Sequence, residues 1–129
     1  MEIRYSNENK RYECDLENLP VFSVDGEAKD IENAKALMEA LIPNLSEIDS
    51  SCRSCAADEL LEIKNDSWLE EDEEPLDRQT FADRLELKRA EFDVDGLTLW
   101  YDDDDMFWGH SIMVVCSKTG APDFAEMLG

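Results

Sequence analysis

Apolar side chains recur every three or four positions through the first half of the chain, which is the spacing of an amphipathic helix. The first stripe begins after Asp30 and is interrupted by Pro43. Its members are Ile31, Ala34, Leu37, Met38, Leu41 and Ile42. The members of a second stripe are Leu45, Ile48, Cys52, Cys55, Ala56, Leu60 and Ile63. Ser46 followed by Asp49 resembles a start signal for this second helix. The spacing therefore predicts two successive helices, each with one buried face.

The helical spacing stops at residues 65–77, NDSWLEEDEEPLD, which predict a loop. This loop contains seven acidic residues and no basic residue. The segment that follows, DRQTFADRL, favours a short third helix, with Asp77 as its N-cap and with Phe81 and Leu85 buried.

Strand signals lie at both ends of the chain. Residues 2–26 contain short apolar runs broken by Asn-rich and Pro-containing turns, which predict two or three short strands. Further along, Val94 and Leu97 flank Asp95-Gly96, a signal for a two-residue hairpin. HSIMVVCS supplies another strand, so residues 86–117 are expected to form an antiparallel meander of three strands.

Strands on both sides of a helical block indicate an α+β fold. We expect an antiparallel sheet, made of the N-terminal strands plus the C-terminal three-stranded meander, packed against two to three helices. The sequence shows no repeat and no linker, and 129 residues correspond to one domain by length. Residues 1–129 are therefore expected to form a single α+β domain.

Residues 101–111, YDDDDMFWGHS, connect the second and third strands of this meander. Four adjacent aspartates are expected to face water at the tip of the connection: Asp102, Asp103, Asp104 and Asp105. Phe107 is expected to turn back to the core, Gly109 to make the corner and His110 to start the next strand. For Trp108, a core position and an exposed position both remain open.

The charge of the chain is strongly negative, with 33 acidic residues against 12 basic ones and a net charge of -21. Residues 65–77 and 101–129 hold the densest acidic runs. Such a field attracts basic proteins and repels phosphate backbones, so we expect a basic protein partner and no direct binding to nucleic acid. No apolar run approaches membrane-spanning length, and the first residues show no signal-peptide pattern. A cytoplasmic protein with free thiols is expected.

The pair Cys52 and Cys55, in CRSC, has a spacing used by zinc sites and redox dithiols. A zinc site would need further ligands from Cys14, Cys116 and His110, and no second paired motif is present. Because the pair lies in a helical apolar stripe, we expect core packing.

A calcium site of the EF-hand type is a second metal hypothesis. Glu91, Asp93, Asp95, Gly96 and Asp102 match the register of such a loop. The strand alternation that follows contradicts the two-helix context, so a hairpin is expected instead. A loose cation site at residues 102–105 is a further alternative.

An enzymatic role would make His110 a general base oriented by one of the aspartates. Ser111 would then lie on the opposite face of the strand, and no nucleophile elbow or phosphate-binding loop is present. We therefore expect a structural histidine, no catalytic residues, no metal and no cofactor.

Two segments, AADELLEIKNDSWLEEDEEPLDRQTFADRLEL and YDDDDMFWGHSIMV, resemble an uncharacterised bacterial family of small acidic proteins. The resemblance rests on Asn65 and Trp68, on the acidic run 70–74, on Phe81 and on the FWGHS motif at residues 107–111. It covers residues 25–117, with a looser match before them and a departure in the tail APDFAEMLG. Small acidic proteins of this kind resemble immunity proteins encoded beside bacterial toxins, some of which block basic nucleases.

Charge and resemblance together favour a noncatalytic binding protein, an immunity protein that neutralises a basic toxin domain such as a nuclease. The acidic contacts are expected at Asp102, Asp103, Asp104, Asp105, Glu70, Glu71, Asp72, Glu73 and Glu74, with Trp108 as the anchor. Phe107, Gly109, His110 and Trp68 are expected to be structural. The alternatives are a housekeeping or regulatory protein without a toxin partner, and a His/Asp metal-dependent enzyme.

Overall fold

The computed structural model describes residues 2–24 and 28–129. Within these residues the strands are β1 (Arg4–Ser6), β2 (Arg11–Leu16), β3 (Leu19–Ser23), β4 (Glu86–Asp93), β5 (Gly96–Asp102), β6 (Ser111–Cys116) and β7 (Pro122–Leu128). The helices are α1 (Ala28–Leu41), the short 3-10 helix η1 (Ile42–Asn44), α2 (Leu45–Ser67) and α3 (Arg78–Arg84).

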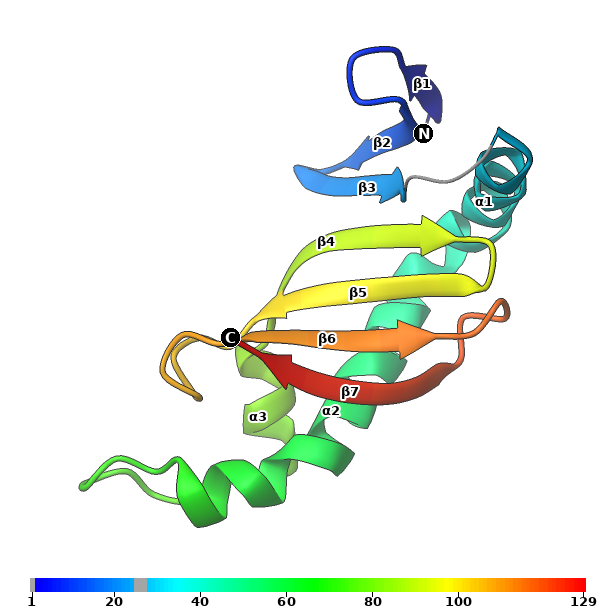
Figure 1. The fold of residues 1–129 in the computed structure, drawn as a ribbon. Coiled ribbons are helices and arrows are strands. Elements are labelled where there is room, and N and C mark those ends of the chain that lie inside the picture. The colour runs from blue at the N-terminus through cyan, green and yellow to red at the C-terminus, as the bar shows by residue number, and fades with distance from the viewer. Residues whose placement is uncertain (1, 25–27) are drawn as a thin grey trace.

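All seven strands form one sheet in the order in which they follow along the chain. Neighbouring strands run antiparallel, except that β3 pairs with β4 in parallel. A parallel pair needs a long crossover connection, and the helices supply it between these two strands (Figure 1). The mixed α+β class is therefore confirmed, with a sheet that is mostly antiparallel.

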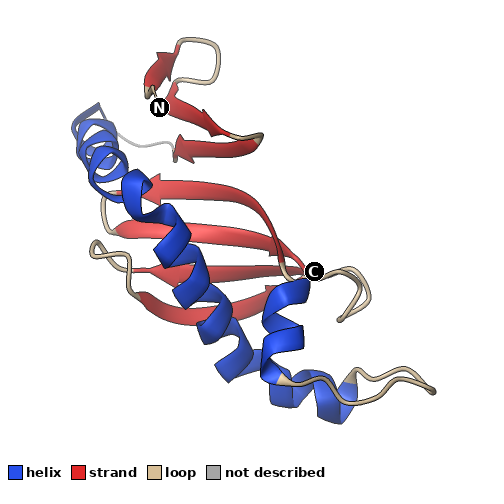
Figure 2. Cartoon of the chain, turned by 180° about the vertical axis from the view of Figure 1, so that it is seen from behind, coloured by secondary structure: helices blue, strands red, loops and turns tan. Residues whose placement is uncertain are grey.

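The helices lie on one face of the sheet, where α2 crosses the strands diagonally (Figure 2). Its apolar stripe packs mainly against β7 and β6, and α1 packs against β4. From the helices Met38, Cys52, Ala56 and Phe81 are buried, and from the sheet Leu97, Leu99, Ile112 and Val114. The two periods of the sequence, 3.6 for helices and 2 for strands, thus meet in one core.

The predicted helices are present, but the expected start signal of the second helix is wrong. Helix α2 begins directly after η1, and its N-cap, Asn44, makes no side-chain hydrogen bond. Asp49 instead accepts hydrogen bonds from Arg53 Nε (3.1 Å) and Tyr101 Oη (2.5 Å). The start of α2 is set by the turn at Pro43 and by the burial of Leu45, with no contribution from a side-chain cap.

The C-terminal meander has four strands, one more than expected. The fourth strand, β7, comes from the tail, where Val114 pairs with Ala125 and Ile112 with Met127. The apolar alternation of this tail is interrupted by acidic residues, so it gives a weak strand signal. Pairing with β6 and packing against α2 decide its structure.

The hairpin between β4 and β5 is confirmed, but its turn lies one residue earlier than expected. Asp93 pairs with Gly96, so the two turn residues are Val94 and Asp95. Gly96 lies at φ +151°, and a Cβ atom there would collide with the carbonyl oxygen of Cys116. The glycine is therefore needed because β6 approaches its backbone closely and because its φ angle is positive.

Among the helices of the described ranges 2–24 and 28–129, none combines the length and the apolar character required to cross a membrane.

Candidate partner-binding site

The loop after α2, called here the acidic loop, comprises residues 68–77. It is shorter than expected, because α2 continues through Asn65 to Ser67. The Asn65 amide donates to Leu76 O (3.0 Å) and accepts from Leu76 N (2.9 Å). Since this side chain bonds across the loop, it does not compete with the helix backbone as asparagine often does. Asn65 fixes the two ends of the acidic loop.

Lys64 holds the acidic loop from inside. Its side chain is 1% exposed, and Nζ donates to Trp68 O and to Glu73 Oε1, each at 2.7 Å. Glu73 Oε1 also accepts from Glu70 N at 3.1 Å. The hydrogen bond from Lys64 has the largest effect on the pKa of the Glu73 carboxyl and the bond from Glu70 N the next largest. Both hold this pKa below its usual value. The Glu73 carboxylate is therefore already paired within the protein.

The second loop, called here the β5–β6 loop, comprises residues 103–110 and is organised by a buried aspartate. The side chain of Asp103 is inaccessible to solvent. Its Oδ1 accepts from Asp105 N (2.9 Å), and its Oδ2 accepts from Phe107 N (2.9 Å), Gly109 N (3.1 Å) and His110 N (2.9 Å). The expectation that all four aspartates face water is therefore wrong for Asp103. Its charge is balanced by four N–H dipoles.

The backbone of the β5–β6 loop explains part of its unusual sequence. Asp104, Asp105, Trp108 and Gly109 have positive φ angles, of 49°, 59°, 63° and 93°. Aspartate and glycine tolerate this left-handed region, whereas a bulky aromatic residue there is uncommon. Two of the aspartates thus suit the turn, and the conformation of Trp108 needs support from its surroundings.

An aromatic cluster supplies that support. The Trp68 ring packs edge-on against Phe107, Trp108 and His110, with centroid distances of 5.6, 4.8 and 5.3 Å. Phe107 is fully buried, as expected, but Trp108 is 61% exposed. The open question about Trp108 is thereby answered: the ring packs at a steep angle against Trp68, and most of it meets solvent.

Arg84, in the last turn of α3, bridges the acidic loop and the β5–β6 loop. Its Nε donates to Asp104 Oδ2 (2.9 Å), and its Nη2 donates to Asp104 O (2.8 Å). Its Nη1 lies 3.7 Å from Glu73 Oε2. A single guanidinium thus holds together two loops of like charge that are separated by about thirty positions in the sequence.

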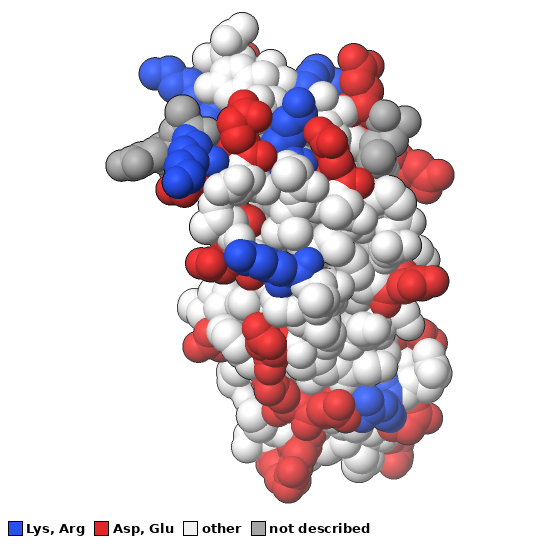
Figure 3. Space-filling view, turned by 90° about the vertical axis from the view of Figure 1, so that its right-hand side faces the viewer, with Lys and Arg blue, Asp and Glu red and all other residues white. Residues whose placement is uncertain are grey.

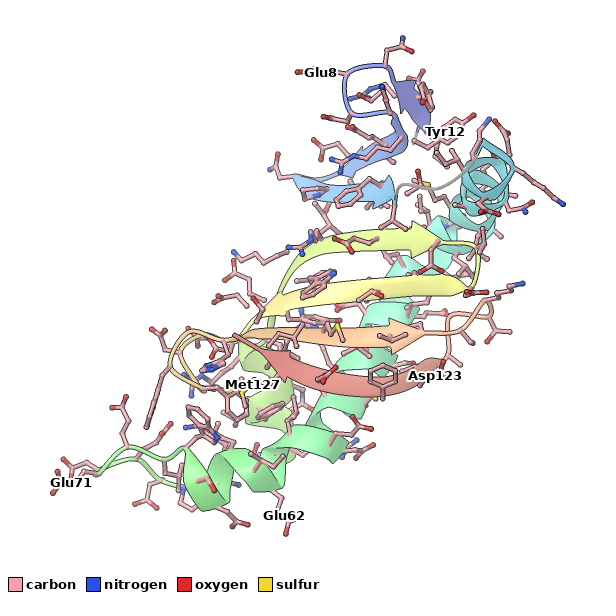
Figure 4. The ribbon with its side chains drawn as sticks, viewed as in Figure 1. Glu8, Tyr12, Glu62, Glu71, Asp123 and Met127 are labelled. Atoms are coloured by element: carbon pink, nitrogen blue, oxygen red, sulfur yellow. The ribbon has the colours of Figure 1, made fainter. Side chains whose placement is uncertain are left out.

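A hollow of about 440 Å³ opens where the two loops meet. It is lined by Glu70, Glu71, Asp72, Glu73, Asp105 and Arg84. In Figure 4, Glu71 marks the outer end of the acidic loop, where the side chains spread away from the body of the protein. Glu70, Glu71, Asp72 and Asp105 are exposed and form no ion pair within residues 2–24 and 28–129. The two acidic runs of the sequence therefore form one site.

The predicted contact residues fall into two groups. The exposed ones are Asp102, Asp104, Asp105, Trp108, Glu70, Glu71, Asp72 and Glu74. Asp103 and Glu73 instead hold the loops in place. Asp104 is exposed but already bound to Arg84.

His110 is a hydrogen-bonded residue just before β6, which starts at Ser111. Its Nδ1 is hydrogen-bonded to Phe107 O, its backbone N–H donates to Asp103 and its ring packs on Trp68. No described acidic side chain is hydrogen-bonded to the imidazole, as a general base oriented by an aspartate would require.

The cysteines of CRSC lie in α2, as expected. Cys52 is fully buried, with its sulfur 3.2 Å from that of Cys116 on β6, and Cys55 is half-buried. The contact with Cys116 and burial raise the pKa of the Cys52 thiol. In the part of the chain that the structure describes, no three His, Cys, Asp or Glu side chains are grouped so as to hold a metal ion.

Two residues that hold this site together, Lys64 and Arg84, were not predicted from the sequence. Lys64 follows Leu60 by four positions, so the helical period already placed it on the buried face of α2. Arg84 follows Phe81 on a helix that lies between two acidic runs in the sequence. Nothing in the sequence paired either base with a particular carboxylate.

The chain thus has a mixed α+β fold with two acidic loops that meet at one aromatic cluster. It belongs to a family described as an uncharacterized protein conserved in bacteria, DUF2262, whose model matches residues 7–127. This match extends beyond residues 25–117 to β2 and β3 and to most of β7. Neither a curated protein nor a solved structure matches the chain.

Proposed function

We propose that this chain is a noncatalytic binding protein that neutralises a basic bacterial toxin domain, as an immunity protein does. The observation that carries the proposal is the convergence of the acidic loop and the β5–β6 loop on one hollow beside an exposed tryptophan. Carboxylates without internal partners would meet lysines and arginines of the toxin. Trp108 would be the apolar anchor, since binding energy is concentrated in aromatic residues surrounded by polar contacts.

Charge supports fast encounter with such a partner. The net charge of -21 creates a long-range attractive field, which can raise association rates to about 10^8 to 10^9 per molar per second at low salt. In the side view of Figure 3, acidic side chains are densest at the lower end, and most of the basic ones lie at the upper end. A toxin that uses its basic residues to hold nucleic acid would lose access to its substrate.

The loops are also preorganised for binding. Asn65, Lys64, Asp103 and Arg84 fix their backbones by bonds to neighbouring segments. Rigid loops lose less conformational freedom on binding, which favours affinity.

The test is coexpression with the product of the adjacent gene, followed by copurification and by a growth assay for relief of toxicity. The decisive variant neutralises three exposed carboxylates of the acidic loop, Glu70→Gln, Glu71→Gln and Asp72→Asn. A matched control neutralises three exposed glutamates elsewhere, Glu2→Gln, Glu8→Gln and Glu47→Gln. We expect the loop variant to weaken the complex about 10-fold to 100-fold, and the control to retain it.

Trp108→Ala tests the contribution of the apolar anchor to binding independently of the acidic contacts. It should raise the dissociation rate and leave the salt dependence unchanged, because it removes contact area without changing charge. The proposal fails if the adjacent gene product neither binds nor harms the cell. It fails equally if the loop variant and the control protect to the same extent, or if high salt leaves the affinity unchanged.

A further inference from the structure

Two buried thiols face each other between α2 and β6, at the end of β6 that is opposite to the β5–β6 loop. The sulfur atoms of Cys52 and Cys116 are 3.2 Å apart, within hydrogen-bonding distance, and the two residues are 0% and 2% exposed. They are 64 positions apart in the sequence. The CRSC motif suggested a pair of Cys52 with Cys55, whereas the fold brings Cys52 to Cys116.

The two elements hold these sulfur atoms in place. Cys116 is the register partner of Leu97 on β5 and of Pro122 on β7, so its strand is paired on both sides. Cys52 lies in the interior of α2, among the buried side chains of that helix. A disulfide has an S–S length of about 2.05 Å, so the two sulfur atoms need to approach by only about 1.1 Å. Small rotations about the two Cα–Cβ bonds supply such a movement.

The contact between the thiols also gives them different chemical roles. A buried cysteine is commonly a small apolar side chain and is inert, because burial disfavours the thiolate that reacts with oxidants. At Cys116 the hydrogen bond from Cys52 opposes this effect and lowers the pKa of the thiol. Cys116 is therefore the nucleophile of the pair, and Cys52 is the thiol that lies beside it to complete a second step.

We infer that Cys52 and Cys116 form a redox-sensitive pair, which closes into a disulfide between α2 and β6 when a peroxide oxidises the protein. The Cys116 thiolate attacks one peroxide oxygen and becomes a sulfenic acid, and the other oxygen leaves as water. The sulfur of Cys52 then attacks the sulfenic sulfur, so that the S–S bond forms and the hydroxyl group leaves as a second water molecule. In total the two thiols give up two electrons and two protons, and the peroxide takes up both.

The disulfide would enclose the part of the chain that carries the acidic loop, α3 and the β5–β6 loop, because all three lie between residues 52 and 116. A crosslink across so long a loop stabilises the folded state mainly by restricting the unfolded chain. Oxidation would thus make the protein harder to unfold while the loops keep their surface. The inference involves no partner, so it stands or falls independently of the proposed function.

The test begins with the reduced full chain, which is treated with hydrogen peroxide, alkylated to mark the remaining thiols and digested for peptide mapping by mass spectrometry. We expect a peptide that links Cys52 to Cys116, with Cys14 and Cys55 alkylated. Oxidation should raise the melting temperature by about 10 °C. Dithiothreitol should abolish this rise, which separates the disulfide from methionine sulfoxides, since dithiothreitol does not remove them.

Three variants test the assignment. Cys116→Ala should lose both the linked peptide and the rise in melting temperature. Cys14→Ala is the matched control, because Cys14 is equally buried but lies on β2, and Cys55→Ser removes the other thiol of CRSC. Both should retain the link and the rise. The peptide map of the natural sequence decides the matter even if Cys116→Ala does not fold. Four alkylated cysteines after peroxide treatment, or a peptide that links Cys52 to Cys55, overturns the inference.

Discussion

A single buried carboxylate sets the shape of the β5–β6 loop. Asp103 accepts hydrogen bonds from four backbone N–H groups within eight residues of chain, and the same loop exposes Asp105 and Trp108. Neighbouring aspartates of one run thus have different roles. One organises the backbone, one is bound to Arg84 and the others face solvent.

At the residue scale, Asp103→Asn is expected to destabilise the protein by about 3 kcal/mol, because hydrogen bonds to a buried charged acceptor are lost or weakened. An amide offers one acceptor oxygen where the carboxylate uses two. Urea unfolding measures the change. Asp105→Asn is the control, since Asp105 is exposed and asparagine tolerates its positive φ, so it should shift stability by less than about 0.5 kcal/mol. Equal effects of both substitutions would contradict the organising role of Asp103.

At the scale of elements, the end of α2, the acidic loop and α3 are joined by polar contacts, in which Lys64 is buried and Glu73 and Arg84 are half-buried. Lys64 contributes its ammonium from α2, Glu73 its carboxylate from the loop and Arg84 its guanidinium from α3. The outer side of the loop can carry many carboxylates because water solvates their charges. It remains ordered because two bases and Asn65 hold it from the inside.

This arrangement predicts a pH dependence. The pKa of Glu73 is lowered in the folded protein, mainly by the hydrogen bond from Lys64. The folded state therefore binds fewer protons at this site than the unfolded state, and its contribution to stability is complete above the ordinary carboxyl pKa of about 4.3. The contribution is lost as the pH falls from there through the lowered pKa of the folded state.

Glu73→Gln isolates the effect. At pH 7 it should cost about 3 kcal/mol, because it leaves the buried Lys64 ammonium without its counter-charge. Urea unfolding from pH 7 to pH 3 should show the difference from the natural sequence shrinking below about pH 4. Glu71→Gln, at the exposed end of the same loop, should behave like the natural sequence at every pH. A Glu73→Gln deficit that is independent of pH would show that lost packing, not charge, is responsible.

At the scale of the whole molecule, a single sheet separates two unlike surfaces. The helices cover one face and complete the core, whereas the described helices leave the other face uncovered (Figure 2). The unpaired acidic residues gather on loops at one end of the sheet.

The net charge predicts how salt affects folding. Repulsion among carboxylates destabilises the compact state, and salt screens it, so the melting temperature should rise by several degrees from about 10 to about 500 mM NaCl. Differential scanning calorimetry at fixed protein concentration measures this shift. The variant with Glu2, Glu8 and Glu47 neutralised should show a smaller shift. A melting temperature that falls with salt would mean that the internal ion pairs outweigh the repulsion.

The local pattern determined the elements of this protein. Periodic apolar positions and Pro43 defined α1 and α2, Asp77 capped α3 as its side chain suggested, and strand alternation with a turn signal defined the β4–β5 hairpin. These features depend on neighbours within a few positions, which a sequence displays directly. The strand in the tail, β7, was not predicted, because its pairing depends on β6 and α2 more than on its own residues.

The sequence by itself determined the composition of the two acidic runs, and only the tertiary structure decided that they form one site. Their convergence depends on where α3 places Arg84 and on the packing of Trp68 against Phe107 and Trp108. The structure also decided which carboxylates remain free, because Asp103 and Glu73 look like their neighbours in the sequence but are bound to N–H groups and to a buried ammonium. Charge can be counted along a chain, whereas the partner that satisfies it is fixed by contacts between distant segments.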